Sequence, residues 1–182
     1  MNVTPTALPG VLILEPKVVA DERGFFMESF NQRDFATAIG QTVTFVQDNH
    51  SLSRRGVLRG LHYQLPPRSQ GKLVRVVHGS AFDVAVDVRR GSPNFGHWIG
   101  VTLDASCHRQ IWIPPGFAHG FLALEDDTHS LYKTTDYYAR DCERAIAWND
   151  PMIAIDWPNL GSSPILAAKD AVAPRLAEAD TF

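Results

Sequence analysis

The segment Arg59-Gly-Leu-His-Tyr-Gln-Leu-Pro-Pro-Arg-Ser-Gln-Gly-Lys72 decides how this chain folds. Strand-like sequence lies on both sides of its centre, over residues 56–61 and again over residues 72–77. Pro66-Pro67 lies between them, and proline cannot donate a hydrogen bond to a sheet ladder. A hairpin-like bend at these prolines is therefore expected to bring His62 and Lys72 onto neighbouring strands.

His62 and Lys72 together have the chemistry needed to remove a proton next to a carbonyl group. The imidazole can take the proton, and the ammonium can stabilise the enolate oxygen that forms. A lone histidine in a strand is, however, more often a structural residue than a catalyst. The rest of the chain has to decide between these two interpretations.

Side-chain alternation separates Arg59 from His62. In a regular strand Gly60, His62 and Gln64 share one face, whereas Arg59 and Leu61 point the other way. For Arg59 and His62 to contact one ligand, the strand has to be irregular. A bulge or twist near Gly60 would allow it.

Short strands separated by Gly/Pro turns follow one another along most of the chain. Beyond those already named, strands are expected within 11–30 and over 42–50, 80–88, 97–103, 109–113, 118–124, 129–135 and 145–148. In the segment 80–88, Phe82, Val84, Val86 and Val88 share one face, and Asp83, Ala85 and Asp87 share the other. The pattern predicts an all-β, antiparallel jelly roll, a barrel or sandwich that can hold a ligand among inward-facing polar residues.

Helix is expected only near the termini. Asn31 can cap a short helix that runs through Ile39 and ends at Gly40. The Ala-rich segment 164–179 predicts one or two short helices interrupted at Pro174. Because there is no internal repeat and no linker, we expect residues 1–182 to form one domain.

Composition indicates an ordinary globular protein: 45% of residues are hydrophobic and 20% are charged. The net charge of −3 gives no reason to expect nucleic-acid binding. Two cysteines form no disulfide framework and suit a reducing compartment. The N-terminus does not resemble a signal peptide, and no apolar run approaches a membrane span. We therefore expect a cytoplasmic protein without a membrane partner.

Polar residues at alternate strand positions are candidates for a site inside the barrel. Gln47 and Asn49 share a face of their strand, and His119 follows a Pro-Pro-Gly turn. Tyr132 lies centrally in its strand. A tyrosine phenol can act as a general acid, or it can simply pack with its hydroxyl hydrogen-bonded.

Seven histidines in a β-rich chain raise the question of a metal site. His62 is followed two residues later by Gln64, and no His-x-His pair occurs, so the metal-binding cupin pattern is missing. Walker, Gly-x-Gly-x-x-Gly and Gly-x-Ser-x-Gly motifs are also missing. We expect neither a metal nor another cofactor.

Eight stretches in order along nearly the whole chain are similar to one family, the dTDP-4-dehydrorhamnose 3,5-epimerases. They are residues 21–28 (DERGFFME), 47–51 (QDNHS), 56–64 (GVLRGLHYQ), 70–76 (QGKLVRV), 82–87 (FDVAVD), 113–121 (IPPGFAHGF), 132–138 (YKTTDYY) and 148–151 (WNDP). Any one of them would be a weak signal, but together they are specific for the family.

The resemblance implies a cupin-like jelly roll, a homodimer, a dTDP-sugar substrate and no metal. It implies that His62 is the base and Tyr132 the acid on the opposite face of the sugar ring. Lys72 would stabilise the enolate formed from the 4-keto group. Asp170 would be the carboxylate that orients His62, with Asp83 of a central strand as the alternative.

The other implied residues contact the nucleotide sugar. In the same subunit they are Gln47, Asn49, Arg59, His119, Glu143 and Lys169, with Tyr138 stacking on the thymine. The N-terminal part of the chain would carry Arg23 and Glu28 across the dimer to the site of the other subunit. The fork of an Arg guanidinium suits the diphosphate.

The implied reaction inverts C3 and C5 of dTDP-4-dehydro-6-deoxy-D-glucose, a step of dTDP-L-rhamnose biosynthesis. A ketone at C4 acidifies the protons at both carbons, so one base and one acid can serve each centre in turn. Three alternatives stay open: a single-centre epimerase of a related dTDP-4-ketodeoxysugar, a metal-dependent cupin enzyme, and a catalytically silent sugar-nucleotide-binding module.

Overall fold

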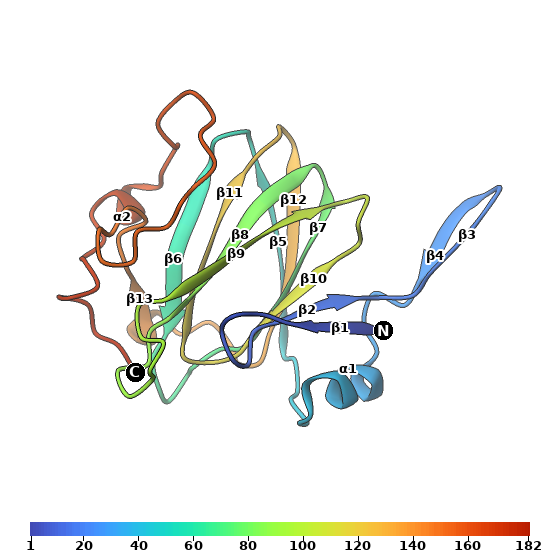
Figure 1. Ribbon diagram of the computed structural model, residues 1–182, viewed down its shortest axis with the longest axis horizontal. Helices are drawn as coiled ribbons and strands as arrows, with labels where there is room; N and C mark the ends of the chain where they lie inside the picture. Colours follow the sequence, from blue (N-terminus) through green and yellow to red (C-terminus); the bar gives the residue numbers. More distant parts are fainter.

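Two antiparallel β-sheets face each other in the computed structural model, which describes residues 1–182 (Figure 1). The six-stranded sheet has the order β1 (Asn2–Pro5), β2 (Leu12–Glu15), β10 (Gln110–Ile113), β7 (Lys72–His78), β12 (Thr128–Thr134) and β5 (Gln47–Ser53). The five-stranded sheet has the order β13 (Glu143–Ala145), β6 (Leu58–Gln64), β11 (Phe117–Ala123), β8 (Ser80–Asp87) and β9 (Trp98–Asp104). This architecture confirms the predicted all-β jelly roll.

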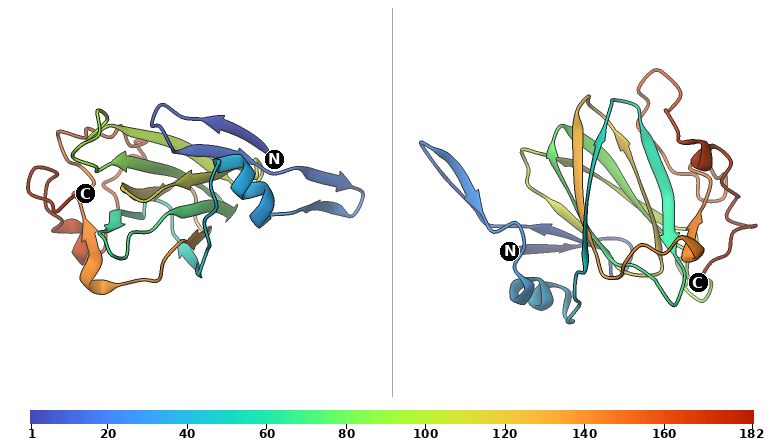
Figure 2. Two further views of the ribbon diagram at one scale, coloured as in Figure 1. Left: turned by 90° about the horizontal axis from the view of Figure 1, so that it is seen from below. Right: turned by 180° about the vertical axis from the view of Figure 1, so that it is seen from behind.

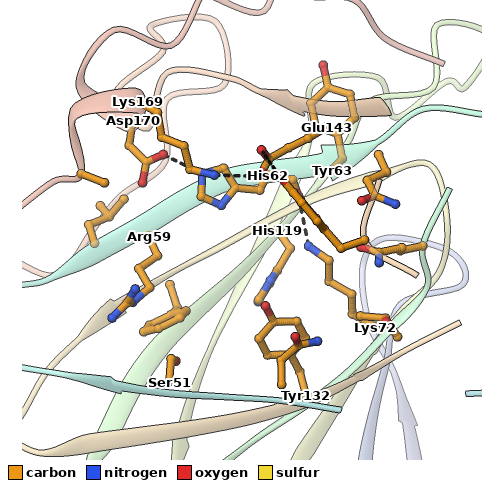
Figure 3. Close-up of a pocket in the computed structure, with 18 of the residues that line it drawn as sticks. Ser51, Arg59, His62, Tyr63, Lys72, His119, Tyr132, Glu143, Lys169 and Asp170 are labelled. Atoms are coloured by element: carbon orange, nitrogen blue, oxygen red, sulfur yellow. Dashed lines mark hydrogen bonds and ion pairs between the residues drawn. The ribbon is translucent and has the colours of Figure 1, made fainter. Parts of the chain in front are cut away.

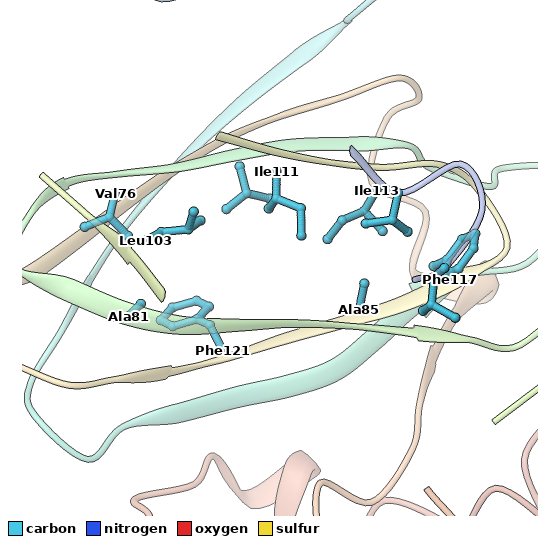
Figure 4. Close-up of a cluster of buried hydrophobic side chains, with 11 residues drawn as sticks. Val76, Ala81, Ala85, Leu103, Ile111, Ile113, Phe117 and Phe121 are labelled. Carbon is cyan, nitrogen blue, oxygen red and sulfur yellow. The ribbon is translucent and has the colours of Figure 1, made fainter. Parts of the chain in front are cut away.

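Apolar side chains fill one part of the interior between the two sheets. The cluster has 11 buried residues, among them Val76 of β7, Ile111 of β10 and Phe121 of β11 (Figure 4). Such packing removes apolar surface from water and holds the sheets together. The remaining part of the interior is polar, and it is there that the predicted site residues gather.

Strand β8 alternates as predicted. Val84, Val86 and Val88 are fully buried in a second cluster, formed on the outer face of the five-stranded sheet with residues such as Leu176 from the C-terminal part of the chain. Ala85 belongs instead to the cluster between the sheets. Asp83 shares that inward face and is 1% exposed.

Helix α1 (Gln32–Ile39) covers the outer face of the six-stranded sheet and has the predicted ends. The side chain of Asn31 accepts hydrogen bonds from the backbone N–H groups of Arg33 and Asp34. Gly40 follows the helix with a left-handed φ of 71°. The helix has eight residues, so it falls well short of the length and apolar character that a helix crossing a bilayer requires, and no other helix meets that requirement.

The hairpin of β3 (Val18–Asp21) and β4 (Gly24–Met27) extends away from both sheets (Figures 1 and 2). Its apolar side chains are exposed to solvent: Val19 is 54%, Phe25 58% and Phe26 71% exposed. Contiguous apolar surface of this kind is typical of a segment that another protein covers.

Predicted strand bounds differ most from the structure at two strands, β5 and β13. The strand expected over 42–50 is β5, which begins only at Gln47 and continues through Ser53, three residues beyond the predicted end. The physical reason is Phe45, which packs edge-on against Trp112 in the cluster beneath α1. The chain joins the sheet only after this contact. The last strand, expected over 145–148, is β13 (Glu143–Ala145).

The predicted C-terminal helix is present, but it is much shorter than the Ala-rich segment 164–179. A single turn of helix forms, α2 (Ala168–Ala171), with a 3-10 turn at Arg140–Cys142 earlier in the chain. The segment before α2 is extended because Ile165 exchanges backbone hydrogen bonds with the start of β6: its N–H donates to Gly56 O and its carbonyl accepts from Leu58 N–H. Tertiary pairing therefore overrides the helix propensity of this Ala-rich sequence.

His62 and Lys72 do not lie on neighbouring strands, which corrects the hairpin prediction. β6 belongs to the five-stranded sheet and β7 to the six-stranded sheet, so the segment around Pro66-Pro67 carries the chain from one sheet to the other. A tight turn would have paired the strands, whereas this longer connection lets them face each other. The Lys72 Nζ nevertheless donates to the backbone carbonyl of His62 across the interior, at 3.2 Å.

The irregularity expected near Gly60 is present. His62 pairs with His119 of β11, and Arg59 pairs with Phe121. The two pairs are three residues apart on β6 but only two residues apart on β11, so β6 contains one extra residue. Gly60 has a φ of 140°, and a Cβ there would lie 2.5 Å from the Gly120 Cα, so a side chain has no room. The bulge lets Arg59 and His62 line the same cavity.

Candidate active site

A cavity of about 450 Å³ lies in the polar part of the interior (Figure 3). Strands of both sheets and the C-terminal segment line it. The predicted site residues in its wall are Gln47, Asn49, Arg59, His62, Lys72, His119, Tyr132, Tyr138, Glu143, Lys169 and Asp170. The fold therefore brings together residues as far apart in the chain as Gln47 and Asp170.

His62 is held by Asp170. Its Nε2 lies 2.6 Å from Asp170 Oδ1, and Asp170 Oδ2 accepts from the backbone N–H of Gly60 at 3.4 Å. Burial alone would raise the pKa of Asp170, but the hydrogen bond with His62 counters burial, and the pKa is lowered overall. A carboxylate only accepts, so Nε2 carries the proton and the other ring nitrogen, Nδ1, is free to take one.

Asp83, the alternative partner of His62, contacts a different histidine. Both of its carboxylate oxygens lie near His119 Nε2, at 3.1 and 3.0 Å. Asp83 is on β8, one strand further from β6 than His119 of β11, so its side chain does not reach His62. The choice between the two carboxylates thus falls on Asp170.

Lys72 brings a buried cation to the cavity. The side chain is 8% exposed, and its Nζ hydrogen bond is the one to the His62 carbonyl. Burial lowers the pKa of Lys72 to about 8, although Asp83 and Glu143 act in the opposite direction. The ammonium therefore prevails at neutral pH and can stabilise a developing oxyanion in the cavity.

Tyr132 enters the cavity from the sheet opposite His62 (Figure 3). Burial raises the pKa of Tyr132, and the charge of Arg59 offsets this only in part, so the phenol keeps its proton at neutral pH. A base on one wall and a protonated phenol on the other can act on the two faces of a ring held between them.

The mouth of the cavity carries a chain of polar contacts. Lys169 Nζ donates to Glu143 Oε1 at 2.7 Å, and Tyr138 Oη donates to Glu143 Oε2 at 3.1 Å. Gln47 connects Tyr138 with Asn49. Its side chain accepts a hydrogen bond from the Tyr138 backbone N–H and donates one to Asn49 Oδ1 at 2.9 Å. The Tyr138 side chain is exposed and leaves a ring face for a flat ligand to stack upon.

Known proteins are similar to this chain over its whole length. The family model described as dTDP-4-dehydrorhamnose 3,5-epimerase matches residues 5–178. The chain belongs to the dTDP-4-dehydrorhamnose 3,5-epimerase family. The Shigella flexneri enzyme of that name is 57% identical over 182 residues, which covers 100% of this chain and 99% of the relative. Proteins of this family are isomerases.

Solved structures of relatives share the fold as well. A crystal structure of dTDP-6-deoxy-D-glucose-3,5-epimerase from Legionella pneumophila, in complex with dTDP-4-keto-L-rhamnose, is 51% identical with a TM-score of 0.95, and covers 98% of this chain and 94% of the relative. A crystal structure of a 3′-monoepimerase from Streptomyces bikiniensis, in complex with dTDP-quinovose, is 37% identical with a TM-score of 0.89. It covers 95% of this chain and 87% of the relative. The family fold thus accommodates enzymes described as acting on two centres or on one.

Two predicted contact residues of this family member, Arg23 and Glu28, lie outside the cavity. Arg23 is in the turn of the β3–β4 hairpin, where its side chain is 85% exposed and pairs with Asp21. Glu28 follows β4 directly, and its side chain accepts from Asn31 at 3.5 Å. Neither residue lines the cavity of the chain that carries it.

Ser51 was missed by the sequence analysis. It lines the cavity, and its buried hydroxyl has no hydrogen-bond partner; the Nδ2 of Asn49 is likewise buried and unpaired. The signal that could have found it is the alternation of Gln47, Asn49 and Ser51 on the inward face of β5. It was overlooked because the predicted strand ended at residue 50. Unpaired buried donors of this kind are available to a polar ligand.

No group of three or more His, Cys, Asp or Glu side chains is arranged to hold a metal ion. Both histidines of the cavity use Nε2 to contact a carboxylate, His62 with Asp170 and His119 with Asp83. These pairs supply proton-transfer and orienting groups.

Proposed function

We propose that this protein epimerises dTDP-4-dehydro-6-deoxy-D-glucose at C3 and C5, giving dTDP-4-dehydro-L-rhamnose for dTDP-L-rhamnose biosynthesis, without a metal or other cofactor. The observation that carries the proposal is that His62 and Tyr132 line one cavity from opposite sheets. The names of the relatives and the sugar bound in the Legionella structure support the substrate.

Each inversion is a proton removal followed by a proton delivery. His62 Nδ1 takes the proton from the carbon next to the ketone, and the C–H electron pair becomes the C=C bond of an enolate whose negative oxygen faces Lys72. Tyr132 then donates its phenol proton to the same carbon from the opposite face, and the ketone re-forms. Solvent returns His62 and Tyr132 to their starting states.

The nucleotide part of the substrate lies towards the mouth in this proposal. The Arg59 guanidinium is already oriented by Ser53 Oγ at 3.1 Å and by the carbonyl of Leu52 at 2.9 Å, so it can present its remaining N–H groups to the diphosphate. Lys169 adds a second cation, and the exposed ring of Tyr138 offers a stacking surface for thymine. His119, Glu143, Gln47 and Asn49 complete the polar lining.

Product stereochemistry tests the proposed function. Purified protein is incubated with dTDP-4-dehydro-6-deoxy-D-glucose, and the ring configuration is read by proton NMR after chemical reduction of the ketone. The L-rhamno product supports the two-centre reaction. Inversion at C3 alone would place the protein with the single-centre enzymes, and binding of dTDP without any inversion would leave a sugar-nucleotide-binding module.

The rate is expected to fall at alkaline pH because Lys72 loses its proton. Burial lowers the pKa of this ammonium to about 8, so its positive charge is present below that pH and is lost as the pH rises through it. Above about pH 8, kcat should therefore decrease about tenfold per pH unit. A pH–rate profile measures this; a kcat that stays level far above the pKa of Lys72 contradicts the role given to its charge.

We also infer a cytoplasmic homodimer in which the β3–β4 hairpin of each subunit reaches the cavity of the other. The exposed Phe25 and Phe26, and the exposed Arg23 of the same hairpin, support this arrangement. The free thiols of Cys107 and Cys142 fit a reducing compartment.

Mixed dimers test the exchange of hairpins. Arg23→Ala should raise KM, and His62→Ala should abolish turnover, when each variant is assayed alone. A hybrid dimer of the two contains one cavity with native His62, served by the native Arg23 of the other chain. Kinetics of separated hybrids are therefore expected to show a native KM and about half of the native kcat. Hybrids that keep the raised KM of Arg23→Ala would show that the hairpin serves its own subunit.

A further inference from the structure

Three buried ionisable side chains lie together beside the His62–Asp170 pair. Asp83 is 1%, His119 7% and Lys72 8% exposed, and they come from β8, β11 and β7. Ionisable groups are rarely buried unless they are paired, because removing a charge from water is costly. His119 and Lys72 line the cavity, whereas Asp83 is not part of its wall.

Asp83 fixes one state of the His119 ring. Its carboxylate accepts from Nε2 at 3.0 and 3.1 Å, so Nε2 carries the proton and Nδ1 presents a lone pair. Burial lowers the pKa of His119, and the charge of Asp83 opposes this only in part. The imidazole is therefore a neutral group of defined orientation in the wall of the cavity.

Lys72 belongs to the same buried group, and the negative charge of Asp83 favours its ammonium. Among the ionic neighbours of Lys72, Asp83 has the largest effect favouring its ammonium, ahead of Glu143. Glu143 is already engaged by Lys169 at 2.7 Å and by Tyr138. The ionisable groups that face Lys72 or His119 are Asp83 (β8), Glu143 (β13), Lys169 (α2), His62 (β6) and the two residues themselves.

We propose that Asp83 is a positioning residue of the reaction: without touching the substrate, it orients the His119 ring and balances the charge of Lys72, so that the enolate forms beside a cation. The proposal rests on the proposed function, because it assigns to Lys72 the stabilisation of the enolate oxygen. It gives the carboxylate a role that a purely structural hydrogen bond within the core would not have.

Asp83→Asn separates charge from shape. The amide has nearly the same size, and its carbonyl oxygen can still accept from His119 Nε2, so the ring stays oriented. The negative charge is gone, and Lys72 gives up its proton more readily. The alkaline limb of the kcat profile should therefore move to lower pH, with about a tenfold loss of kcat at pH 8, the region where Lys72 titrates, and a much smaller loss near pH 6.

Asp87→Asn is the matched control. Asp87 lies on the same face of β8, is 0% exposed, and pairs with Arg89 at 2.6 Å outside the cavity. Removing either carboxylate should lower the melting temperature. A displaced alkaline limb is expected for Asp83→Asn alone, so stability loss and loss of charge balance are distinguishable.

The decisive experiment is the pH dependence of kcat for wild type, Asp83→Asn and Asp87→Asn, with dTDP binding measured beside it to verify intact sites. An inactive wild type would overturn the proposed function itself. If the wild type is active and its alkaline limb coincides with that of Asp83→Asn, the role given to Asp83 is overturned while the proposed function stands. If Asp83→Asn does not fold, Asp83→Glu serves instead: the limb should stay in place while kcat falls, and a limb displaced to lower pH contradicts the proposal.

Discussion

Replacing His62 by asparagine is expected to lower kcat by on the order of 10³-fold, within the range that a positioned general base contributes. Asparagine can still donate to Asp170, so the local structure survives, but it cannot take a proton from carbon. The nucleotide contacts proposed for Arg59 and Tyr138 are untouched, so dTDP affinity should change little.

Steady-state kinetics and dTDP titration measure the two effects separately. His97→Asn is a suitable control, because His97 is an exposed residue outside the cavity. If His62→Asn kept a kcat near that of the control, the base would have to be another residue. A parallel loss of dTDP binding would instead indicate a disturbed site.

Replacing Tyr132 by phenylalanine is expected to separate proton removal from inversion. The phenol remains protonated at neutral pH because burial raises its pKa, and phenylalanine keeps the ring without that proton. His62 can still remove and return a proton on its own face, so solvent exchange at the reacting carbons should continue. Formation of the inverted product should fall by about 10²–10³-fold, since delivery from the opposite face is lost.

The experiment compares the rate of solvent deuterium uptake into recovered substrate with the rate of product formation. Tyr137→Phe is the matched control, because Tyr137 is the neighbour of Tyr138, is 59% exposed and does not line the cavity. Equal inversion rates in Tyr132→Phe and Tyr137→Phe would leave Tyr132 with a packing role.

Local patterns were sufficient to predict much of this fold. The alternation of Val84 and Val86 with Asp83 and Ala85 correctly assigned the two faces of β8, because side chains in a strand point in turn to either side. The ends of α1 followed from Asn31 and Gly40, whose capping chemistry depends on a few adjacent atoms.

Long-range placement was not predictable from the same patterns. A proline-containing bend between two strands is compatible with a hairpin or with a crossing between sheets, and the crossing at Pro66-Pro67 depends on packing of the whole sandwich. Asp170 contacts His62 from a segment that Ile165 ties to the start of β6, and this pairing overrides local helix propensity. The resemblance to a family suggested Asp170, where spacing along the chain could not.

The measurement that tests the central claim most directly is position-resolved deuterium uptake. Wild-type protein and His62→Ala are incubated with dTDP-4-dehydro-6-deoxy-D-glucose in D₂O, and the label at C3 and C5 is read by mass and NMR. Because His62 and Tyr132 exchange protons with the solvent, we predict deuterium at both carbons with the wild-type protein. We predict no deuterium at either carbon with His62→Ala. Complete inversion without label, or label that persists unchanged in His62→Ala, would contradict a mechanism in which His62 and Tyr132 invert the sugar from opposite walls of one cavity.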